Sequence, residues 1–342
     1  LVAGVLHWDG AGISVLDEPS LAVVSSALLL ASTVPTPYEN LGVPGATTLD
    51  VTEALTFETS QAGNNQFFDV ILRNPDFGDV SMLGQTIAQG PTLVTLWIGN
   101  NDILGGATSG EPVMGQNVTP ASLFSGLLGG IIATLETGVE ARFGYTPEIV
   151  VGNIPPILSA PYFVPKAQFD LITTGGAVPY PTDEDDVAYV RFPGLQLADA
   201  ELTPLPASYT LTAAEAAVVD DAVAAYNDAI DTVAAENGAA VADIHGMLVG
   251  QPAAAKTHFQ FLLMGEPPLT VEEAAATTAF SLDGLHPNNR GYTLIANTFI
   301  EAINAHLGLE GDAVIAPATE RPWDPTYAGY AGKTSRSLAF ER

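Results

Sequence analysis

The sequence predicts an α/β fold, a three-layer α/β/α sandwich built around a parallel sheet. Short apolar runs alternate along the chain with segments of helical periodicity, which is typical of successive strand–helix units. The run Thr92–Ile98 is almost continuously apolar, as expected for a parallel strand that helices cover on both faces. The 342 residues suffice for one large domain or two small ones. No break in the pattern marks a second domain.

Apolar runs that stop at turn-forming residues identify the expected strands. Such runs are short, and Pro or Gly is a common end of a strand because neither residue continues a strand well. The first of them stops at Pro44–Gly45. The expected strands are Tyr38–Val43, Thr92–Ile98, Ile149–Val151 and Ala239–Ile244.

Capping residues and apolar periodicity define three long helices. Thr119 is expected to cap a helix that has Pro120 at its first position and extends to about Arg142. Thr212 and Glu215 have the spacing of a capping box at the start of a second helix, which should stop at Asn237–Gly238. The third helix is amphipathic and lies around Tyr292–Leu307.

Two stretches lack either periodicity. Between residues 162 and 209 the pattern gives way to Pro, Gly and acidic residues, and a stretch of this length inside a domain is often a functional insertion. It either covers a pocket or forms a surface excursion. The chain is also irregular and Pro-rich from Gly311 onward. We therefore expect one domain over residues 1–310 with an insertion at about 162–209, followed by an irregular tail at 311–342.

The charge composition excludes several classes of partner. Asp and Glu number 39 against 10 Lys and Arg, a net charge of −29 at pH 7, so neither nucleic acid nor an anionic membrane surface is expected as a partner. The chain has no Cys, which excludes disulfides and thiolate chemistry. Apolar runs such as Leu21–Ala31 fall short of the ~20 residues that span a bilayer, so we expect no integral membrane segment.

The acidity itself has two interpretations. Charged residues make up 14% of the chain, yet most of them are acidic, and salt screens the resulting repulsion within about 8 Å at physiological ionic strength. One hypothesis is a protein from a salt-rich habitat. The other is an ordinary acidic secreted protein.

Three polar segments follow predicted strands, where an open α/β sheet places its ligand site. They are Asn40–Thr48, Trp97–Asp102 and Asp283–Asn288. In the last of these, Asp283 and His286 have a spacing that lets a carboxylate hold one imidazole nitrogen while the other faces outward, as in a general base. Alternatively, Asp283 caps the turn and His286 is a partly buried polar residue.

The other two segments offer donors for an oxyanion. Gly45 lies between Pro44 and a small residue, a context that allows its N–H to approach a ligand closely, although a plain strand-exit turn explains it as well. Asn101 can supply a side-chain amide, or it can satisfy loop backbone groups instead. Asp102 is expected to brace the same loop.

Together these segments resemble the SGNH hydrolases, also called the GDSL lipase/esterase family. LGVPGATT (residues 41–48) resembles the family's glycine block, WIGNND (97–102) its Gly-x-Asn-Asp block, and DGLHPN (283–288) its Asp-x-x-His block, all in the family's order. Weaker similarity extends the resemblance over most of the chain from Tyr38 to Leu307. It implies a flavodoxin-like sandwich with a parallel sheet of about five strands.

The resemblance implies a serine esterase that hydrolyses carboxylic esters through an acyl-enzyme. His286 would be the general base, Asp283 would orient it, and Gly45 and Asn101 would hold the oxyanion. No cofactor or metal is implied. The substrate would be a small-molecule, lipid or carbohydrate ester, and the family is often exported. The sequence leaves the oligomeric state, the compartment, the acyl-chain length and the alcohol open.

The family's first block, which carries the nucleophilic serine, has no counterpart in the sequence. Leu1-Val2-Ala3-Gly4 resembles the residues on the C-terminal side of that serine, so the serine is expected immediately before Leu1 and the first strand upstream of it. The alternatives are a catalytically inactive binding protein with the same fold, or a thioesterase or polysaccharide deacetylase of the same family.

Overall fold

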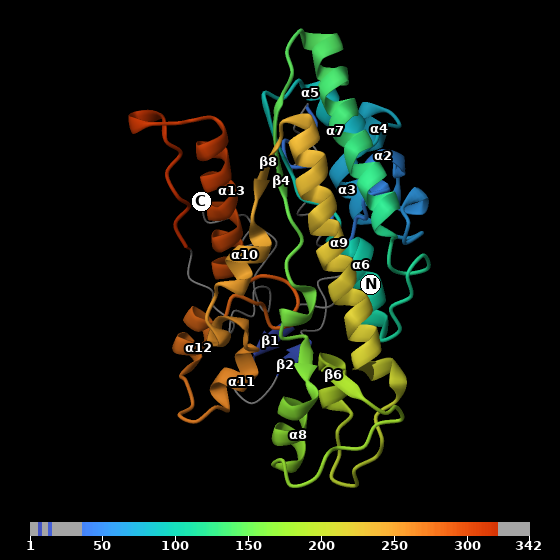
Figure 1. Ribbon diagram of the computed structural model, residues 1–342, viewed down its shortest axis with the longest axis vertical. Coiled ribbons are helices and arrows are strands. Elements are labelled where there is room, and N and C mark those ends of the chain that lie inside the picture. The colour runs from blue at the N-terminus through green and yellow to red at the C-terminus, as the bar shows by residue number, and fades with distance from the viewer. Residues whose placement is uncertain (1–5, 9–12, 16–35, 321–342) are drawn as a thin grey trace, which may run out of the picture.

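A computed structural model describes residues 6–8, 13–15 and 36–320, and its central feature is a small parallel sheet (Figure 1). Within the described chain, the sheet contains β3 (Leu93–Leu96), β4 (Glu148–Gly152) and β8 (Ala240–Ala242) in that order, all parallel. Helices cover both of its faces, as predicted for a mixed α/β fold. The predicted segments Thr92–Ile98 and Ala239–Ile244 contain β3 and β8, and the predicted segment Ile149–Val151 lies within β4.

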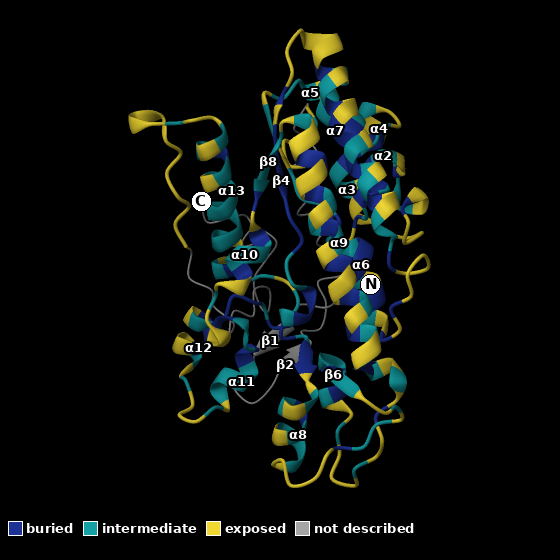
Figure 2. Cartoon of the chain, in the orientation of Figure 1, coloured by how far each residue is buried: buried dark blue, intermediate teal, exposed yellow. Residues whose placement is uncertain are grey.

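The side chains of β4 alternate between two apolar clusters. Ile149 and Val151 belong to the main core with α5 (Met82–Gln89), α7 (Ala121–Phe143) and α9 (Ala213–Asn237). Val150 faces the opposite side, where it packs in the cluster that contains Phe299 and Ile303 of α13 (Asn289–His306). This period of two is the geometry of a strand buried on both faces, and Figure 2 shows the strand as buried and the outer helix faces as exposed.

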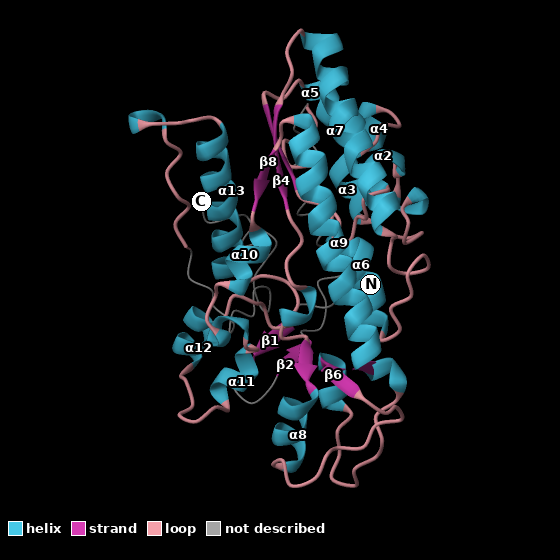
Figure 3. Cartoon of the chain, viewed as in Figure 1, coloured by secondary structure: helices cyan, strands magenta, loops and turns pink. Residues whose placement is uncertain are grey.

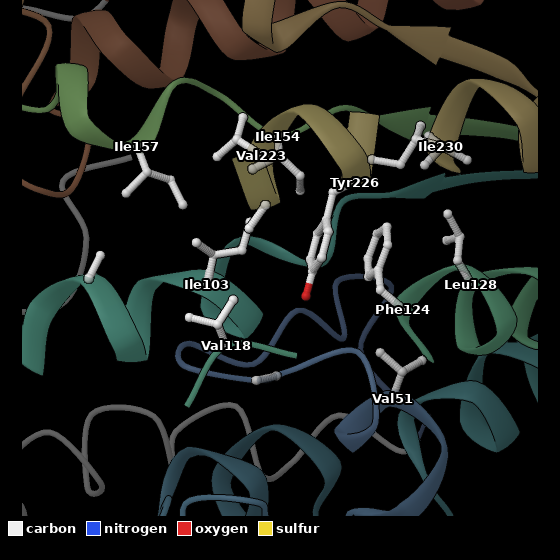
Figure 4. Close-up of a cluster of buried hydrophobic side chains, with 14 of the residues drawn as sticks. Val51, Ile103, Val118, Phe124, Leu128, Ile154, Ile157, Val223, Tyr226 and Ile230 are labelled. Atoms are coloured by element: carbon white, nitrogen blue, oxygen red, sulfur yellow. The ribbon is translucent and has the colours of Figure 1, made fainter. Parts of the chain in front are cut away.

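The main core is densest between α7 and α9. The rings of Phe124 and Tyr226 stack with their centroids 4.0 Å apart (Figure 4). The Tyr226 hydroxyl donates a hydrogen bond of 2.6 Å to the Thr119 carbonyl oxygen, which satisfies the polar end of a side chain that is otherwise buried. By length and apolar composition α7 also qualifies as a membrane span, but its buried side chains pack in this core.

The predicted helix boundaries are mostly confirmed. Thr212 and Glu215 form the predicted capping box, and α9 ends at Asn237 before Gly238, whose φ is +67°. The last helix begins at Asn289, earlier than predicted, because the Asn288 side chain caps it by accepting from the Gly291 N–H. The prediction that Thr119 caps α7 is wrong: no side-chain cap is present, and Pro120 occupies the N-cap position.

The predicted strand Tyr38–Val43 is absent. These residues run in coil past β3, which pairs only with β4 within the described chain. An isolated extended segment has no neighbour to accept its backbone hydrogen bonds, so no ladder forms. The described sheet therefore has three parallel strands instead of about five.

The insertion folds into short strands and a helix (Figure 3), and it has a small core. It carries an antiparallel sheet of β5 (Phe163–Pro165), β6 (Val187–Arg191) and β7 (Thr210–Thr212), together with α8 (Lys166–Thr174). Its core contains five fully buried side chains, which are Val164, Phe169, Tyr180, Val190 and Leu205. Regular structure was not predicted here from the sequence, because none of the strands has more than five residues and such short strands give little periodic signal.

The remaining elements are short. Two antiparallel strands, β1 (Leu6–Trp8) and β2 (Ile13–Val15), lie near the start of the chain. The other helices are α2 (Asp50–Glu53), α3 (Phe67–Leu72), α4 (Asn74–Phe77), α6 (Asn100–Ser109), α10 (Ile244–Val249), α11 (Phe259–Leu263) and α12 (Val271–Thr277). The described part of the tail, 311–320, is exposed, and two bidentate side chains of α13, Asn297 and Asn304, hold its backbone at Ala318 and Ile315.

Candidate active site

Asp283 and His286 form a hydrogen-bonded pair in the turn before α13. The Oδ2 atom of Asp283 lies 2.6 Å from Nδ1 of His286. A carboxylate only accepts hydrogen bonds, so Nδ1 carries the proton and the Nε2 lone pair is left for another partner. The His286 side chain is 66% exposed, whereas that of Asp283 is 34% exposed. The predicted pairing is confirmed, with the imidazole on the solvent side.

The second carboxylate oxygen of Asp283 shapes the turn. Oδ1 accepts hydrogen bonds from the Ser281 hydroxyl at 2.6 Å and from the backbone N–H groups of Leu285 and His286, both at 2.9 Å. The capping role considered as the alternative is therefore also present. One carboxylate both folds the 281–286 turn and holds the imidazole.

The pKa values of the two groups move apart as a consequence. Burial acts against the charge of Asp283, but the hydrogen bonds from His286, Ser281 and Leu285 outweigh it and lower the pKa of this carboxyl to about 2. The hydrogen bond to Asp283 raises the pKa of His286 above its ordinary value, against the smaller opposing effect of desolvation. Near neutral pH, Asp283 is therefore ionised and the imidazole is a stronger base than a free histidine.

Gly45 occupies the third position of a tight turn. The Ala46 N–H donates to the Val43 carbonyl oxygen at 3.1 Å, and Gly45 has a φ of +79°. Pro at the second position and a positive φ at the third are the marks of a type II turn, which requires Gly there. To the described part of the chain, the Gly45 N–H donates no hydrogen bond.

Asn101 connects this turn to the end of β3. It lies in the first turn of α6, and its Nδ2 donates a hydrogen bond of 2.8 Å to the Ala46 carbonyl oxygen. An amide nitrogen carries two protons, and the second one has no acceptor among the described residues. Gly45 and Asn101, predicted from separate motifs, therefore lie side by side. We call the surface formed by the Pro44–Ala46 turn and the Asn101 amide the ledge.

Asp102 holds the segment that carries Gly45, whereas the prediction was that it braces its own loop. It is 3% exposed, and its Oδ2 accepts from both the backbone N–H (2.8 Å) and the hydroxyl (2.9 Å) of Thr48. Burial raises the pKa of Asp102, and the hydrogen bonds from Thr48 oppose this rise. Asp50 ties the neighbouring residue in the same way, because its Oδ2 accepts from the N–H and hydroxyl of Thr47 at 2.8 and 2.9 Å.

The candidate site has two halves, the Gly45–Asn101 ledge beyond the carboxyl end of β3 and the Asp283–His286 pair in the 281–286 turn. Asn101 follows β3, while the 281–286 turn is attached to the segment that follows β4 through a 2.9 Å hydrogen bond from the Tyr162 N–H to the Gly284 carbonyl oxygen. No hydrogen bond within the described residues joins the two halves directly.

A cavity of about 1010 Å³ runs along the outer edge of β3 up to the ledge. Every residue from Pro91 to Asn101 lines it. Its other walls are largely apolar and come from the coil before Gly45 and from both helical layers, including Leu41, Val43, Met82, Leu83, Ile131, Leu135 and Phe299.

Several polar residues at this end of the sheet could not be singled out from sequence motifs. Ser281 and the buried His258 support the 281–286 turn, and neither belongs to a recognisable motif. Asn153 and Asp243 join the ends of β4 and β8 through a 2.8 Å side-chain hydrogen bond. Among the residues with described positions, no group of three or more His, Asp and Glu side chains is arranged to hold a metal ion.

A comparison with known protein families identifies the family of the chain. The GDSL-like lipase/acylhydrolase family model matches residues 10–299, which include the ledge and the Asp283–His286 pair. The chain belongs to this family. Membership in the GDSL acylhydrolases implies an esterase-type hydrolase that acts on ester substrates.

The chain was also compared with solved structures and with curated proteins. The crystal structure of LAE5, an α/β hydrolase enzyme from the metagenome of Lake Arreo, Spain, is similar to this GDSL acylhydrolase at 16% identity, over 83% of this chain and 81% of that one, with a TM-score of 0.35. No curated protein matches the sequence.

Proposed function

We propose that the protein is a serine esterase that hydrolyses carboxylic esters through an acyl-enzyme, with His286 as general base, Asp283 as its orienting partner, and Gly45 and Asn101 as oxyanion donors. The observation that carries this proposal is the 2.6 Å Asp283–His286 pair, which leaves Nε2 of an exposed imidazole without a proton.

The nucleophile is a serine that immediately precedes Leu1, at the end of a further parallel strand beside β3. Two features support this placement. The β3 edge facing the cavity has backbone groups that no described strand pairs, and unpaired backbone in an apolar surrounding is costly. In addition, the coil at Leu41–Val43 lines the same cavity and would gain a neighbour there, which accounts for a predicted strand that is absent. With these two strands, the sheet reaches the predicted number of about five.

The reaction is determined by the donors and acceptors of the site. His286 Nε2 takes the serine proton as the serine oxygen attacks the ester carbonyl carbon, and the positive imidazolium is stabilised by ionised Asp283. The Gly45 N–H, the second N–H of Asn101 and the serine N–H hold the resulting oxyanion. Collapse of the intermediate expels the alcohol, which receives the proton from His286. Water then attacks the acyl-enzyme by the same steps and releases the acid.

Hydrolysis of nitrophenyl esters by the full-length protein tests this function. We expect turnover of at least part of a chain-length series, and loss of that turnover in the variant whose serine before Leu1 is replaced by Ala. Unchanged hydrolysis in that variant would assign the chemistry to another group. An absence of turnover with every ester would favour the binding-protein alternative. Thioester and acetylated polysaccharide substrates in the same series distinguish the related acyl transfers.

A further inference from the structure

His258 occupies a fully buried position directly beneath the 281–286 turn. Its side chain is 0% exposed, and its Nε2 lies 2.9 Å from the Leu282 carbonyl oxygen. On the other side of the ring, Nδ1 accepts from the Gln260 N–H at 3.2 Å and caps α11. A carbonyl oxygen only accepts and an N–H only donates, so the imidazole is neutral and carries its proton on Nε2. Burial accordingly lowers the pKa of His258 to about 4.

The ring of His258 contacts two aromatic side chains. Its centroid lies 4.3 Å from that of Phe192, which belongs to the insertion, and 5.5 Å from that of Phe261 on α11. Gly284 packs against the ring edge: a Cβ at this position would stand 3.0 Å from His258 Cδ2. The φ of +71° at Gly284 also favours glycine. The turn thus rests on His258 with no intervening side chain.

A continuous chain of contacts links the 281–286 turn to the insertion and back to the turn. The Tyr162 N–H donates to the Gly284 carbonyl oxygen at 2.9 Å, and the Phe192 N–H donates to the Tyr162 carbonyl oxygen at 2.7 Å. The Phe192 ring contacts the His258 ring at an interplanar angle of 33°, and the His258 Nε2–H donates to the carbonyl oxygen of Leu282, the residue before Asp283. The backbone on both sides of Asp283 is therefore held by groups outside the turn.

We propose that His258 is a positioning residue: its neutral imidazole, clamped by the insertion and by α11, holds the Leu282–Gly284 backbone so that Asp283 directs His286 toward the substrate. This inference rests on the proposed function for its effect on turnover. The effect of His258 on the Nδ1 proton and the pKa of His286 is independent of the proposed function. The insertion then serves the reaction as a support for the turn, whether or not it also covers the substrate.

The first test reads His286 directly, by ¹⁵N-histidine NMR of the full-length protein, with His286→Ala used to assign the signals. In His258→Phe, which keeps a ring but removes the donor, we expect the His286 Nδ1 proton to exchange faster with water and the pKa of His286 to fall toward its ordinary value. His258→Gln keeps a donor toward Leu282 and should restore both signals. Gln85→Leu is the matched control. It removes a buried donor of α5 from the carbonyl oxygen of Leu72 on α3, away from the turn, and should leave the Nδ1 proton exchange and the pKa of His286 unchanged.

Activity and the wild-type signals complete the test. We expect kcat to fall by about 10-fold or more in His258→Phe with KM nearly unchanged, because the base is misdirected while the binding surface remains. His286 signals and kcat equal to those of wild type in His258→Phe would overturn the proposal. If this variant does not fold, the tautomer of His258 in the wild type, read by ¹⁵N NMR, is the test. A proton on Nδ1 instead of Nε2 would overturn the proposal. If the wild type turns over no ester while the His286 signals still respond to His258→Phe, the proposed function fails and the positioning role stands.

Discussion

The Asn101 side chain donates a 2.8 Å hydrogen bond to the Ala46 carbonyl oxygen, which fixes the position of its amide beside Gly45. This bond joins two sequence motifs that lie on different elements, the turn at Pro44–Gly45 and the start of α6. It orients one amide proton inward and leaves the other for a ligand. The ledge is thus formed before any substrate arrives, as electrostatic stabilisation of an oxyanion requires.

Asn101→Ala should therefore reduce kcat by at least about 10²-fold, since one preorganised oxyanion donor contributes about 2.7–4 kcal/mol. The measurement is steady-state hydrolysis of a short-chain nitrophenyl ester by the full-length protein. Asn65→Ala is the control, because Asn65 Nδ2 holds the same turn from outside through the Pro44 carbonyl oxygen at 2.8 Å. A similar loss of kcat in both variants would reduce Asn101 to a structural role.

Asp102→Ala should destabilise the fold. The substitution leaves the Thr48 N–H and hydroxyl without their shared acceptor, and such a buried loss costs about 1–3 kcal/mol. Urea unfolding measures the change in the free energy of unfolding. Asp69→Ala serves as the comparison, because among the described residues the Asp69 side chain accepts a single, exposed hydrogen bond from the Phe57 N–H, so its loss should cost less. Equal stability of Asp102→Ala and wild type would contradict the bracing role.

The pH dependence of kcat/KM should have an acid limb above the ordinary pKa of histidine. His286 must be neutral to accept a proton, and its pKa is raised by Asp283, so activity increases with pH through this raised value. Asp283→Asn removes the raising effect. We expect the acid limb of its residual activity to move to lower pH. A limb that stays at the wild-type pH would show that another group titrates.

Stability should decrease on acidification because of His258. Its pKa is about 4 in the folded protein and about 6.5 when unfolded, so the unfolded state binds more protons between these values. The free energy of unfolding should therefore be fully retained above about pH 6.5, fall by up to about 3 kcal/mol toward pH 4, and lose nothing further from this group below that. Denaturant unfolding from pH 7 to 4 measures the change. In His258→Gln this component should be missing, and an identical pH slope in the variant would contradict the assignment.

The net charge of −29 gives the salt hypothesis a direct test. If the acidity reflects a salt-rich habitat, the melting temperature should continue to rise as NaCl increases from physiological to molar concentration. At physiological ionic strength the screening length is already about 8 Å. Sucrose, which screens no charge, is the control for exclusion effects. No gain in melting temperature up to molar NaCl would reject the halophile hypothesis in favour of an ordinary acidic protein.

The sequence predicted the elements whose signals are local. β3 and β4 lie where apolar runs indicate strands, and α9 begins and ends where the capping box and Gly238 place it. The Asp283–His286 bond was also predictable, because three residues in one turn bring the two side chains together. The strand predicted at Tyr38–Val43 is absent, because a strand also depends on a neighbour that the local sequence does not contain.

Contacts between distant segments account for what the sequence missed. His258 carries no motif, and its role depends on Phe192 from the insertion and Leu282 from the turn. The insertion itself reads as irregular because its strands are short and its core forms only when they meet. Gly332–Thr334, whose resemblance to the end of a phosphate-binding loop we reject on sequence grounds, lies outside the described residues.

The most direct test of the central claim is the intact mass of the full-length protein after exposure to a phosphonate ester, together with mapping of the labelled peptide. The account predicts a single adduct on the serine before Leu1, formed by wild type and strongly slowed in His286→Ala. No adduct on wild type, or an adduct on any residue of the described chain, would contradict it.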